Sequence, residues 1–289
     1  MPELVVASFN VHAGVDGWGR PHDVVGACRR IDADVLILQE SWDPDSGTSV
    51  ARSVADALGY TVEELVVARG WLASGHGGAS RRWGPRFRLR RTRALLLDGR
   101  HRRDQRGGTN DGAHGGPPRS VSRGSAARRW QHGSWGVAVL SRLPVRTVRR
   151  IDLGKLRRDR GRRGALQVHV DAGGTEVVVV GTHLSHLSHG SPVQFRRLAR
   201  ALAGLVGPAV LAGDMNLWGP PVSVLLPGWR RAVRGRTWPA WRRLAQPDHV
   251  LVAGRVRVLD GTVLHDGGSD HLPVRCRLAV GDPDDPGGS

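Results

Sequence analysis

Short apolar runs bounded by polar turns recur along the chain and predict a protein rich in β-strands. Leu4–Asn10, Asp34–Glu40 and Ala209–Ala212 are almost continuously apolar until their ends, a pattern typical of strands buried on both faces. Between them the apolar residues recur at three- and four-residue intervals, which indicates helices. The further predicted strands cover residues 60–68, 136–145, 145–153, 165–170, 176–180, 248–253, 256–264 and 272–280, and the helices cover 22–31, 49–58, 192–206 and 220–226.

The order of these elements predicts the fold class. Some strands alternate with helices, whereas others follow one another directly as hairpins. This mixture favours an α/β fold in which two mixed β-sheets pack on each other and helices flank them, a four-layer sandwich.

The domain organisation follows from the same pattern. No break separates two cores, so we expect a single domain over residues 1–281, followed by a polar tail at 282–289. Residues 81–129 hold fifteen arginines and three aspartates. Because this region has too few apolar residues to offset the entropy of ordering, we expect a disordered Arg/Gly-rich insertion at about 100–133.

The formal net charge of +17 comes almost entirely from arginine, since Lys155 is the only lysine. Arginine binds phosphate bidentately, which favours a polyanionic partner such as nucleic acid, although a codon bias toward arginine gives the same excess. Cys28 and Cys276 lie in apolar patterns and are expected in the core. Without a leader pattern or a run of about 20 apolar residues, we expect no membrane span and a cytoplasmic protein.

Polar residues gather where the predicted buried strands end. Taken singly, each has a structural explanation, such as an asparagine in a turn or a histidine satisfied within the core. Together they bring carboxylates, amides and imidazoles to the strand ends, where packing does not require them. The groups are Asn10 and His12, Gln39 and Glu40, Thr182 and His183, Asp214 and Asn216, Asp248 and His249, and Ser269 to His271.

These residue types indicate phosphate chemistry assisted by a hard cation. Carboxylate oxygens with few nitrogens and no thiolate favour Mg²⁺ or Mn²⁺, which would polarise a P–O bond and neutralise developing charge. A zinc site is the alternative, because His183, His186 and His189 are evenly spaced in a Ser-rich loop. Asp214, held by Asn216, could orient and deprotonate an attacking water.

Six blocks of sequence resemble the motifs of the endonuclease/exonuclease/phosphatase superfamily, and they occur in the family's order. The resemblance implies a two-sheet α/β sandwich with its site at the top of the sheets. It also implies metal-dependent phosphoesterase activity similar to that of pancreatic-type deoxyribonucleases. The blocks are Ser8–Asn10, Leu38–Glu40, Gly181–Leu184, Leu211–Asn216, Pro247–Val252 and Gly268–Val274.

The resemblance implies a role for each site residue. Glu40 would ligate Mg²⁺, with Asn10 nearby and Asp270 close to a second metal position. For catalysis, Asp214 would orient or deprotonate the water. The remaining implied roles are Asn216 holding Asp214 and the phosphate, His271 paired with Asp270 and stabilising the phosphoryl charge, His183 as acid or phosphate ligand, and Asp248 orienting a neighbour such as His183.

Three departures from the family's patterns narrow the range of activities expected of this chain. His12 stands where abasic-site endonucleases carry an aspartate, and Tyr60 is the only tyrosine, outside the central segment. The segment 185–188 does not reproduce the motifs of the phosphoinositide phosphatases. A role in abasic-site repair is therefore disfavoured.

The favoured function is hydrolysis of phosphodiester bonds, most naturally in nucleic acid. A phosphatase acting on a small phosphorylated metabolite or a lipid headgroup is the alternative within the same core. A non-catalytic nucleic-acid-binding protein is the alternative of another class, and the complete set of polar groups argues against it. Tryptophans bordering the Arg-rich stretch could stack on bases or simply anchor the fold: Trp71, Trp83, Trp130 and Trp135.

Overall fold

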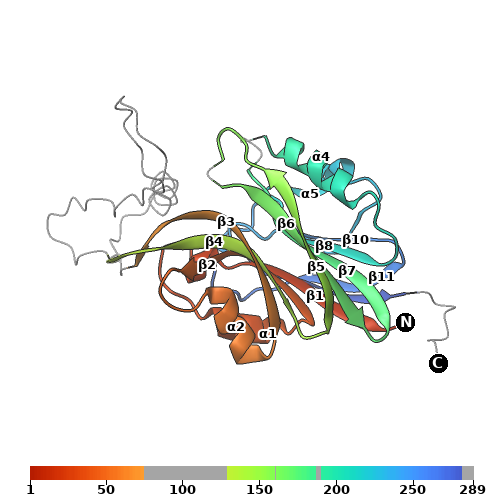
Figure 1. The fold of residues 1–289 in the computed structure, drawn as a ribbon, viewed down its shortest axis with the longest axis horizontal. Coiled ribbons are helices and arrows are strands. Elements are labelled where there is room, and N and C mark those ends of the chain that lie inside the picture. Colours follow the sequence, from red (N-terminus) through yellow and green to blue (C-terminus); the bar gives the residue numbers. More distant parts are fainter. Residues whose placement is uncertain (75–128, 160, 187–189, 282–289) are drawn as a thin grey trace, which may run out of the picture.

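Two six-stranded sheets form in the part of the chain that the computed structural model describes, residues 1–74, 129–159, 161–186 and 190–281 (Figure 1). The first sheet has the order β11-β12-β1-β2-β4-β3 and the second β5-β6-β7-β8-β10-β9. Both are mixed, because β1–β2 and β7–β8 are parallel and the other pairs are antiparallel. The α/β fold class expected from the sequence is confirmed.

Each predicted apolar run overlaps a strand, but β3 and β4 extend well beyond their runs and β9 was not predicted. In the first sheet the strands are β1 (Glu3–Asn10), β2 (Val35–Pro44), β3 (Thr61–Ser74), β4 (Arg129–Ser141), β11 (Val256–Val263) and β12 (Val274–Val280). In the second they are β5 (Val145–Gly154), β6 (Arg163–Ala172), β7 (Thr175–His183), β8 (Ala209–Asp214), β9 (Arg230–Arg231) and β10 (Asp248–Ala253).

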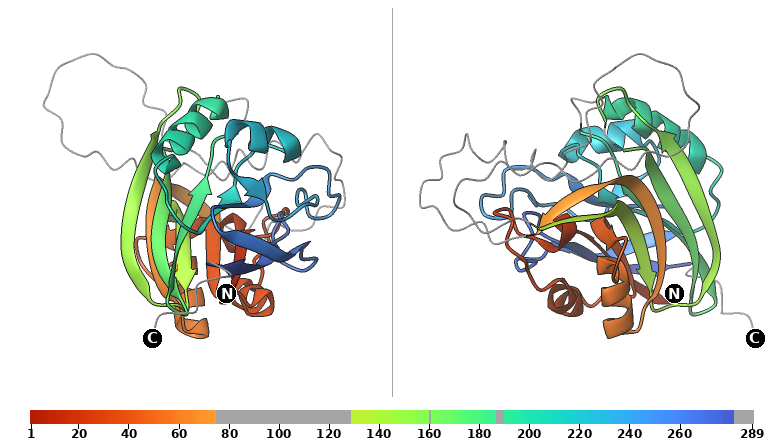
Figure 2. Two further views of the ribbon diagram at one scale, coloured as in Figure 1. Left: turned by 90° about the vertical axis from the view of Figure 1, so that its right-hand side faces the viewer. Right: turned by 60° about the vertical axis from the view of Figure 1, so that its left-hand side comes forward.

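Alternation along the strands builds the layers. Val177 and Val179 of β7 face the first sheet and join the core between the sheets, whereas Val178 and Val180 face outward. Helices α4 (Ser191–Leu202) and α5 (Gly219–Leu225) cover that outward face. Helices α1 (Val24–Ile31) and α2 (Val50–Leu58) cover the outer face of the first sheet. Two further views show the helices on opposite outer sides of the sandwich (Figure 2).

Both predicted core cysteines are buried and free. Burial raises the pKa of each thiol to about 12, so neither is an accessible thiolate at neutral pH. None of the helices within the described ranges is long and apolar enough to cross a membrane.

The expected Arg/Gly-rich insertion ends earlier than the sequence suggests. Residues 129–133 belong to β4, where Gly133 pairs with Gly70 and Arg129 with Ser74 of β3. Pairing between backbones requires few apolar side chains, so local composition failed to indicate this strand. The remainder of the expected insertion and the tail at 282–289 lie outside the described residues.

The two parallel pairs place the polar strand ends together. Helix α1 connects β1 to β2, and α4 connects β7 to β8, as parallel neighbours require a crossover. Asn10 pairs with Gln39 at one set of carboxyl ends, and His183 pairs with Asp214 at the other. In open α/β sheets, ligands bind beyond such carboxyl ends.

Candidate active site

Asp214 lies at the centre of the candidate site, at the last position of β8. Its side chain is only 2% exposed. Its Oδ1 accepts a hydrogen bond from the backbone N–H of Asn216 at 2.9 Å, and its Oδ2 accepts one from Asn10 Nδ2 at 3.1 Å. Because burying a carboxylate without partners is costly, these donors make the position tenable.

The glycine before Asp214 allows β8 to approach β7 closely. Gly213 has a φ of +152°, and a Cβ built on it would lie 1.9 Å from the carbonyl oxygen of Thr182. No other residue type fits this position without moving the strands. The close approach sets Asp214 beside His183 in the parallel register.

Two imidazoles flank the Asp214 carboxylate. His183 Nε2 lies 3.7 Å from Asp214 Oδ2, and His271 Nε2 lies 3.9 Å from the same oxygen. Both histidines are buried, at 7% and 8% exposure. They come from different sheets, because His183 ends β7 and His271 precedes β12. The contact therefore exists only where the two sheets meet.

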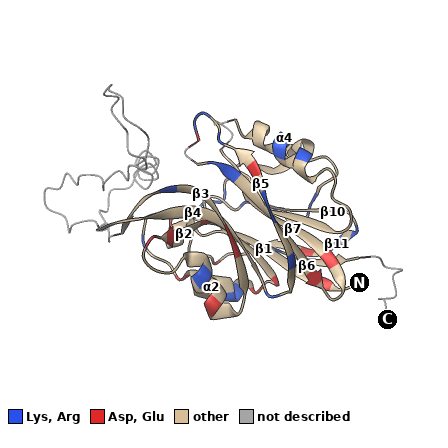
Figure 3. Ribbon diagram, viewed as in Figure 1, with Lys and Arg blue, Asp and Glu red and all other residues tan. Residues whose placement is uncertain are grey.

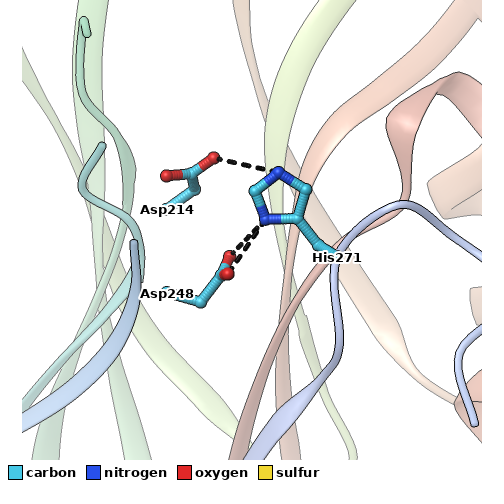
Figure 4. Close-up of side chains that lie close together, drawn as sticks. All are labelled: Asp214, Asp248 and His271. Atoms are coloured by element: carbon cyan, nitrogen blue, oxygen red, sulfur yellow. Dashed lines mark hydrogen bonds and ion pairs between the residues drawn. The ribbon is translucent and has the colours of Figure 1, made fainter. Parts of the chain in front are cut away.

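His271 is held by Asp248 rather than by the neighbouring Asp270 (Figure 4). The distances from His271 Nδ1 to the two Asp248 oxygens are 3.1 and 2.9 Å. The hydrogen-bond partner of His271 is thus Asp248, where the sequence suggested Asp270, and the histidine that Asp248 contacts is His271 and not His183. The reason is that β10 pairs antiparallel with β8, which brings Asp248 opposite Asp214.

This arrangement leaves His271 between carboxylates. Burial disfavours the charged imidazolium, but the carboxylates of Asp248, Asp270 and Asp214 outweigh that effect. Together they raise the pKa of His271 well above its usual value. A cation can therefore persist here at neutral pH, facing the space beside Asp214.

His183 is the opposite case. Burial, reinforced by the Arg163 guanidinium, lowers the pKa of His183 to about 3, and Asp214 offsets only part of that shift. Asn216, held at a left-handed φ of 50°, donates from Nδ2 to the Leu184 carbonyl at 3.0 Å. The same nitrogen lies 3.2 Å from His183 Nε2. The site thus contains one neutral and one charged imidazole.

Glu40 lies on a β-bulge and not, as expected, at the end of a strand. β2 continues to Pro44, and its register with β4 shifts between Gln39 and Ser41. Glu40 is the extra residue, at a left-handed φ of 54°, a conformation that costs about 1–3 kcal/mol. Its Oε1 accepts a hydrogen bond from Asn10 Nδ2 at 3.3 Å. Asn10 consequently bridges Glu40 and Asp214.

Asp270 reaches the same region from the other side of Asn10. The Ser269 hydroxyl donates to the Asn10 carbonyl oxygen at 2.8 Å and lies 3.3 Å from Asp270 Oδ1. His12 Nδ1 is 3.6 Å from Asp270 Oδ1, and the His12 backbone N–H donates to Asn10 Oδ1 at 3.0 Å. Glu40 thus contacts the Asn10 side chain directly, and Asp270 is linked to the Asn10 backbone through Ser269.

Sequence reasoning missed two supporting contacts. The Thr237 hydroxyl donates to Asp248 Oδ2. Behind His183, Arg163 donates from Nε to Asp159 Oδ2 at 3.1 Å and from Nη1 to the His183 carbonyl at 3.4 Å. The spacing of four residues between Asp159 and Arg163 was the available signal in the sequence.

The donor set fits a hard divalent cation. Glu40 and Asp270 supply carboxylate oxygens and Asn10 an amide, the ligand types that Mg²⁺ or Mn²⁺ selects. Ligand atoms of Asp214, Asp248 and His271 also lie within 4.8 Å of one another. In that second group the Asp248 oxygens already contact His271 Nδ1, so it fits a hydrogen-bonded chain better than an ion site. Of the possible zinc triplet, His189 lies outside the described residues.

Comparison with known proteins identifies what the chain resembles. The sequence profile of the Endonuclease/Exonuclease/phosphatase family matches residues 7–271. No curated protein sequence matches the chain significantly.

Solved structures share the fold at low sequence identity. An endonuclease/exonuclease/phosphatase from Beutenbergia cavernae is 22% identical, with a TM-score of 0.60 over 97% of this chain and 72% of that one. The human Nocturnin catalytic domain with bound sulfate is 15% identical, with a TM-score of 0.58 over 97% and 94%. TDP2 from D. rerio, complexed with a single-strand DNA product, is 13% identical, with a TM-score of 0.57 over 96% and 99%. At these identities the likeness establishes the fold alone.

Proposed function

The chain belongs to the endonuclease/exonuclease/phosphatase family, and from this premise we propose that it hydrolyses phosphodiester bonds of nucleic acid with Mg²⁺ or Mn²⁺ as cofactor. One observation carries the proposal. The Asp214 carboxylate is fixed by two donors while two imidazole nitrogens, of His183 and His271, lie within 4 Å of its Oδ2. A base and phosphate-binding groups thus converge on one point.

Asp214 orients and deprotonates the attacking water. The contacts from Asn216 and Asn10 leave the carboxylate little freedom, so a water bound to it has a defined direction toward phosphorus. The reaction is an in-line displacement, in which the water oxygen forms the new P–O bond and the leaving oxygen departs opposite it. Asp214 takes the proton of the water.

The imidazoles and the amide bind the phosphoryl group. Asp248 holds His271 as an imidazolium, whose Nε2–H opposes the negative charge that develops on the phosphoryl oxygens. His183 is neutral and serves as a hydrogen-bonding phosphate ligand rather than as a source of charge. Asn216 positions His183 and reaches the same space.

Glu40, Asn10 and Asp270 would hold the cation. When bound, it supplies Lewis acidity at a phosphoryl oxygen. The strained bulge at Glu40 supports this assignment, because left-handed backbone at a non-glycine residue concentrates at functional sites. A divalent cation held there would also neutralise the carboxylates that bind it.

The charge distribution favours nucleic acid as substrate. The chain carries a net charge of +17, and arginines lie on β5 and α4 among other elements (Figure 3). Such charge attracts a polyanion through phosphate contacts and counterion release. The D. rerio TDP2 structure contains a single-strand DNA product, which is consistent with the same substrate class.

An apolar groove favours a second candidate, hydrolysis of a lipid headgroup phosphate. The groove has a volume of about 510 Å³ and begins one residue after Asn216; its lining is Leu217, Trp218, Pro220, Pro221, Val224 and Leu225. An acyl chain would fit this lining. The groove lining carries no charged side chain that would attract a polyanion. Hydrolysis of nucleic acid and hydrolysis of a lipid headgroup would use the same catalytic groups and differ only in the substrate.

A metal-dependent activity screen tests the proposal. Single-stranded and duplex DNA, RNA, a small phosphomonoester and a phospholipid are incubated with Mg²⁺, Mn²⁺ or EDTA. We expect cleavage of nucleic acid that EDTA and Asp214→Asn both abolish, while Asp56→Asn, on the exposed face of α2, remains active. Release of phosphate from monoester or lipid with nucleic acid intact would contradict the proposed substrate. Salt-sensitive binding to nucleic acid without hydrolysis of any ester would indicate a non-catalytic nucleic-acid-binding protein.

A further inference from the structure

Three indole rings gather on loops beside the candidate active site, and we name them the tryptophan platform: Trp18, Trp238 and Trp241. Trp238 and Trp241 are 41% and 38% exposed, a large exposure for side chains of this size. The rings of Trp18 and Trp241 pack with centroids 4.8 Å apart. Exposed aromatic side chains beside polar catalytic groups commonly mark a binding site.

The platform is continuous with the catalytic groups. The Trp238 ring centroid lies 6.4 Å from that of His271, at an interplanar angle of 48°. The backbone N–H of Ala240 donates to the Asp270 carbonyl at 2.7 Å. A Cβ on Gly17 would lie 3.2 Å from Asp270 Cβ. The Trp238 ring therefore lies beside the imidazole that we propose to bind the phosphate.

The loop that carries Trp238 is held rigidly. Trp238 exchanges backbone hydrogen bonds with Ala245, at 3.0 and 2.9 Å, and Leu244 N–H donates to the Trp238 carbonyl at 2.8 Å. Leu272 N–H donates to Thr237 at 2.9 Å, which ties the loop to the residue after His271. A preorganised aromatic surface loses little entropy when a ligand stacks on it.

Gly17 packs directly against the Trp241 indole. A Cβ on Gly17 would lie 2.2 Å from Cζ3 of Trp241, so the glycine lets its loop pass flat against the indole. The Trp18 amide is fixed in turn by Asp16 Oδ1 at 2.8 Å. The two loops thus hold their rings at the surface, although indoles that serve only as anchors are normally covered.

Cations surround the platform. Arg20 lies over the Trp18 ring at 5.4 Å from its centroid and is also ion-paired with Asp16 at 2.7 Å. Arg236, Arg242 and Arg243 are exposed on the segment that carries Trp238 and Trp241. Flat aromatic faces interleaved with arginines match a chain of bases joined by phosphates, and they match an acyl chain poorly.

We propose that the tryptophan platform stacks the unpaired base next to the scissile phosphate, so that the enzyme selects single-stranded nucleic acid. This inference rests on the proposed function and names its substrate class. A base inside a duplex is already stacked on its neighbours and cannot lie flat on Trp238 without being extruded. Single strands present their bases freely.

A double-mutant cycle on binding tests the inference. Asp214→Asn protein, which we expect to bind without cleaving, is titrated with a short labelled single strand and with copies that carry an abasic sugar at one position each. We expect Trp238→Ala to weaken binding to the intact strand about tenfold to a hundredfold. With Trp238 present, an abasic sugar at one position should weaken binding by a similar factor. With Trp238→Ala the same abasic sugar should hardly change the affinity, because the stacking contact has already been removed.

Further variants separate stacking from folding and from general hydrophobicity. Trp238→Phe should retain most of the affinity and Trp238→Leu should lose it, since only an aromatic ring stacks. Val206→Ala is the control, because Val206 is 91% exposed just before the amino end of β8, the end opposite Asp214, and this variant should bind as the parent does. Thermal unfolding confirms that each variant is folded.

The outcomes of the inference and of the proposed function can be told apart. Equal affinity of Trp238→Ala and parent, or equal losses with intact and abasic strands, would overturn the inference even if the wild-type protein cleaves nucleic acid. Coupling between Trp238 and one base without any cleavage would support the platform and contradict the proposed function. Failure to bind any oligonucleotide would overturn both.

Discussion

Replacing Asp248 with asparagine tests whether the charge on His271 contributes to the reaction. Asparagine has nearly the shape of aspartate, so it preserves the packing of this fully buried position. It removes the carboxylate that lies 2.9 and 3.1 Å from His271 Nδ1. Burial is then opposed only by Asp270 and Asp214, so the pKa of His271 should fall and the ring should lose its proton.

The magnitude follows from the contacts. A hydrogen bond to a charged group contributes about 1.5–3 kcal/mol. Because His271 can become neutral instead of remaining an unpaired buried charge, we expect a loss of about 1–2 kcal/mol in the free energy of unfolding. Removing one electrostatic donor from a transition state costs about 2.7–4 kcal/mol, so kcat should fall about 10²–10³-fold. Urea unfolding and steady-state cleavage of an oligonucleotide measure the two quantities.

Thr237→Val is the matched control for this experiment. It removes the hydroxyl that donates to Asp248 but leaves the Asp248–His271 pair intact. We expect kcat to fall much less than with Asp248→Asn, because the carboxylate that keeps His271 charged remains in place. If Asp248→Asn lost stability while kcat stayed within about threefold of wild type, the carboxylate would be structural and the reasoning would be refuted.

Three further predictions concern the metal, the pH dependence and the strand approach. Glu40→Gln should raise the Mg²⁺ concentration needed for half-maximal rate at least about tenfold, and an unchanged Mg²⁺ titration would exclude Glu40 as a ligand. His249 Nε2–H donates to the Leu217 carbonyl oxygen at 2.9 Å, and burial lowers the pKa of His249 to about 4. Between pH 6.5 and 4 the unfolded state therefore binds a proton at this histidine and the native state does not. The free energy of unfolding should fall by at most about 3 kcal/mol as the pH drops from about 6.5 to 4. His249→Gln should flatten that slope in urea titrations, and an equally steep slope would assign it to other groups. Gly213→Ala should destabilise the fold by about 3 kcal/mol or more, because its Cβ would lie 1.9 Å from Thr182 O, and an unchanged melting temperature would contradict that geometry.

The local pattern of side chains was sufficient for most of the fold. Alternating apolar positions such as Val177 and Val179 face one core and Val178 and Val180 the other, which a period of two dictates before any tertiary contact forms. The carboxylate of Asp214 and the amide of Asn216 likewise indicate a polar strand end. The bulge at Glu40 could not be predicted in this way, because a bulge depends on the register with the partner strand and does not change the apolar pattern of its own strand.

The sequence by itself determined which side chains are available and on which strand ends they lie. Only the tertiary structure decided their partners: His271 pairs with Asp248 and not with the adjacent Asp270, and Trp238 lies beside His271. Neighbours in sequence differ in the direction of their side chains, whereas strands far apart in sequence are brought to hydrogen-bonding distance by sheet register and by the packing of the two sheets. The residue types therefore limit which chemistry is available, whereas long-range strand pairing sets the distances of about 3 Å on which that chemistry depends.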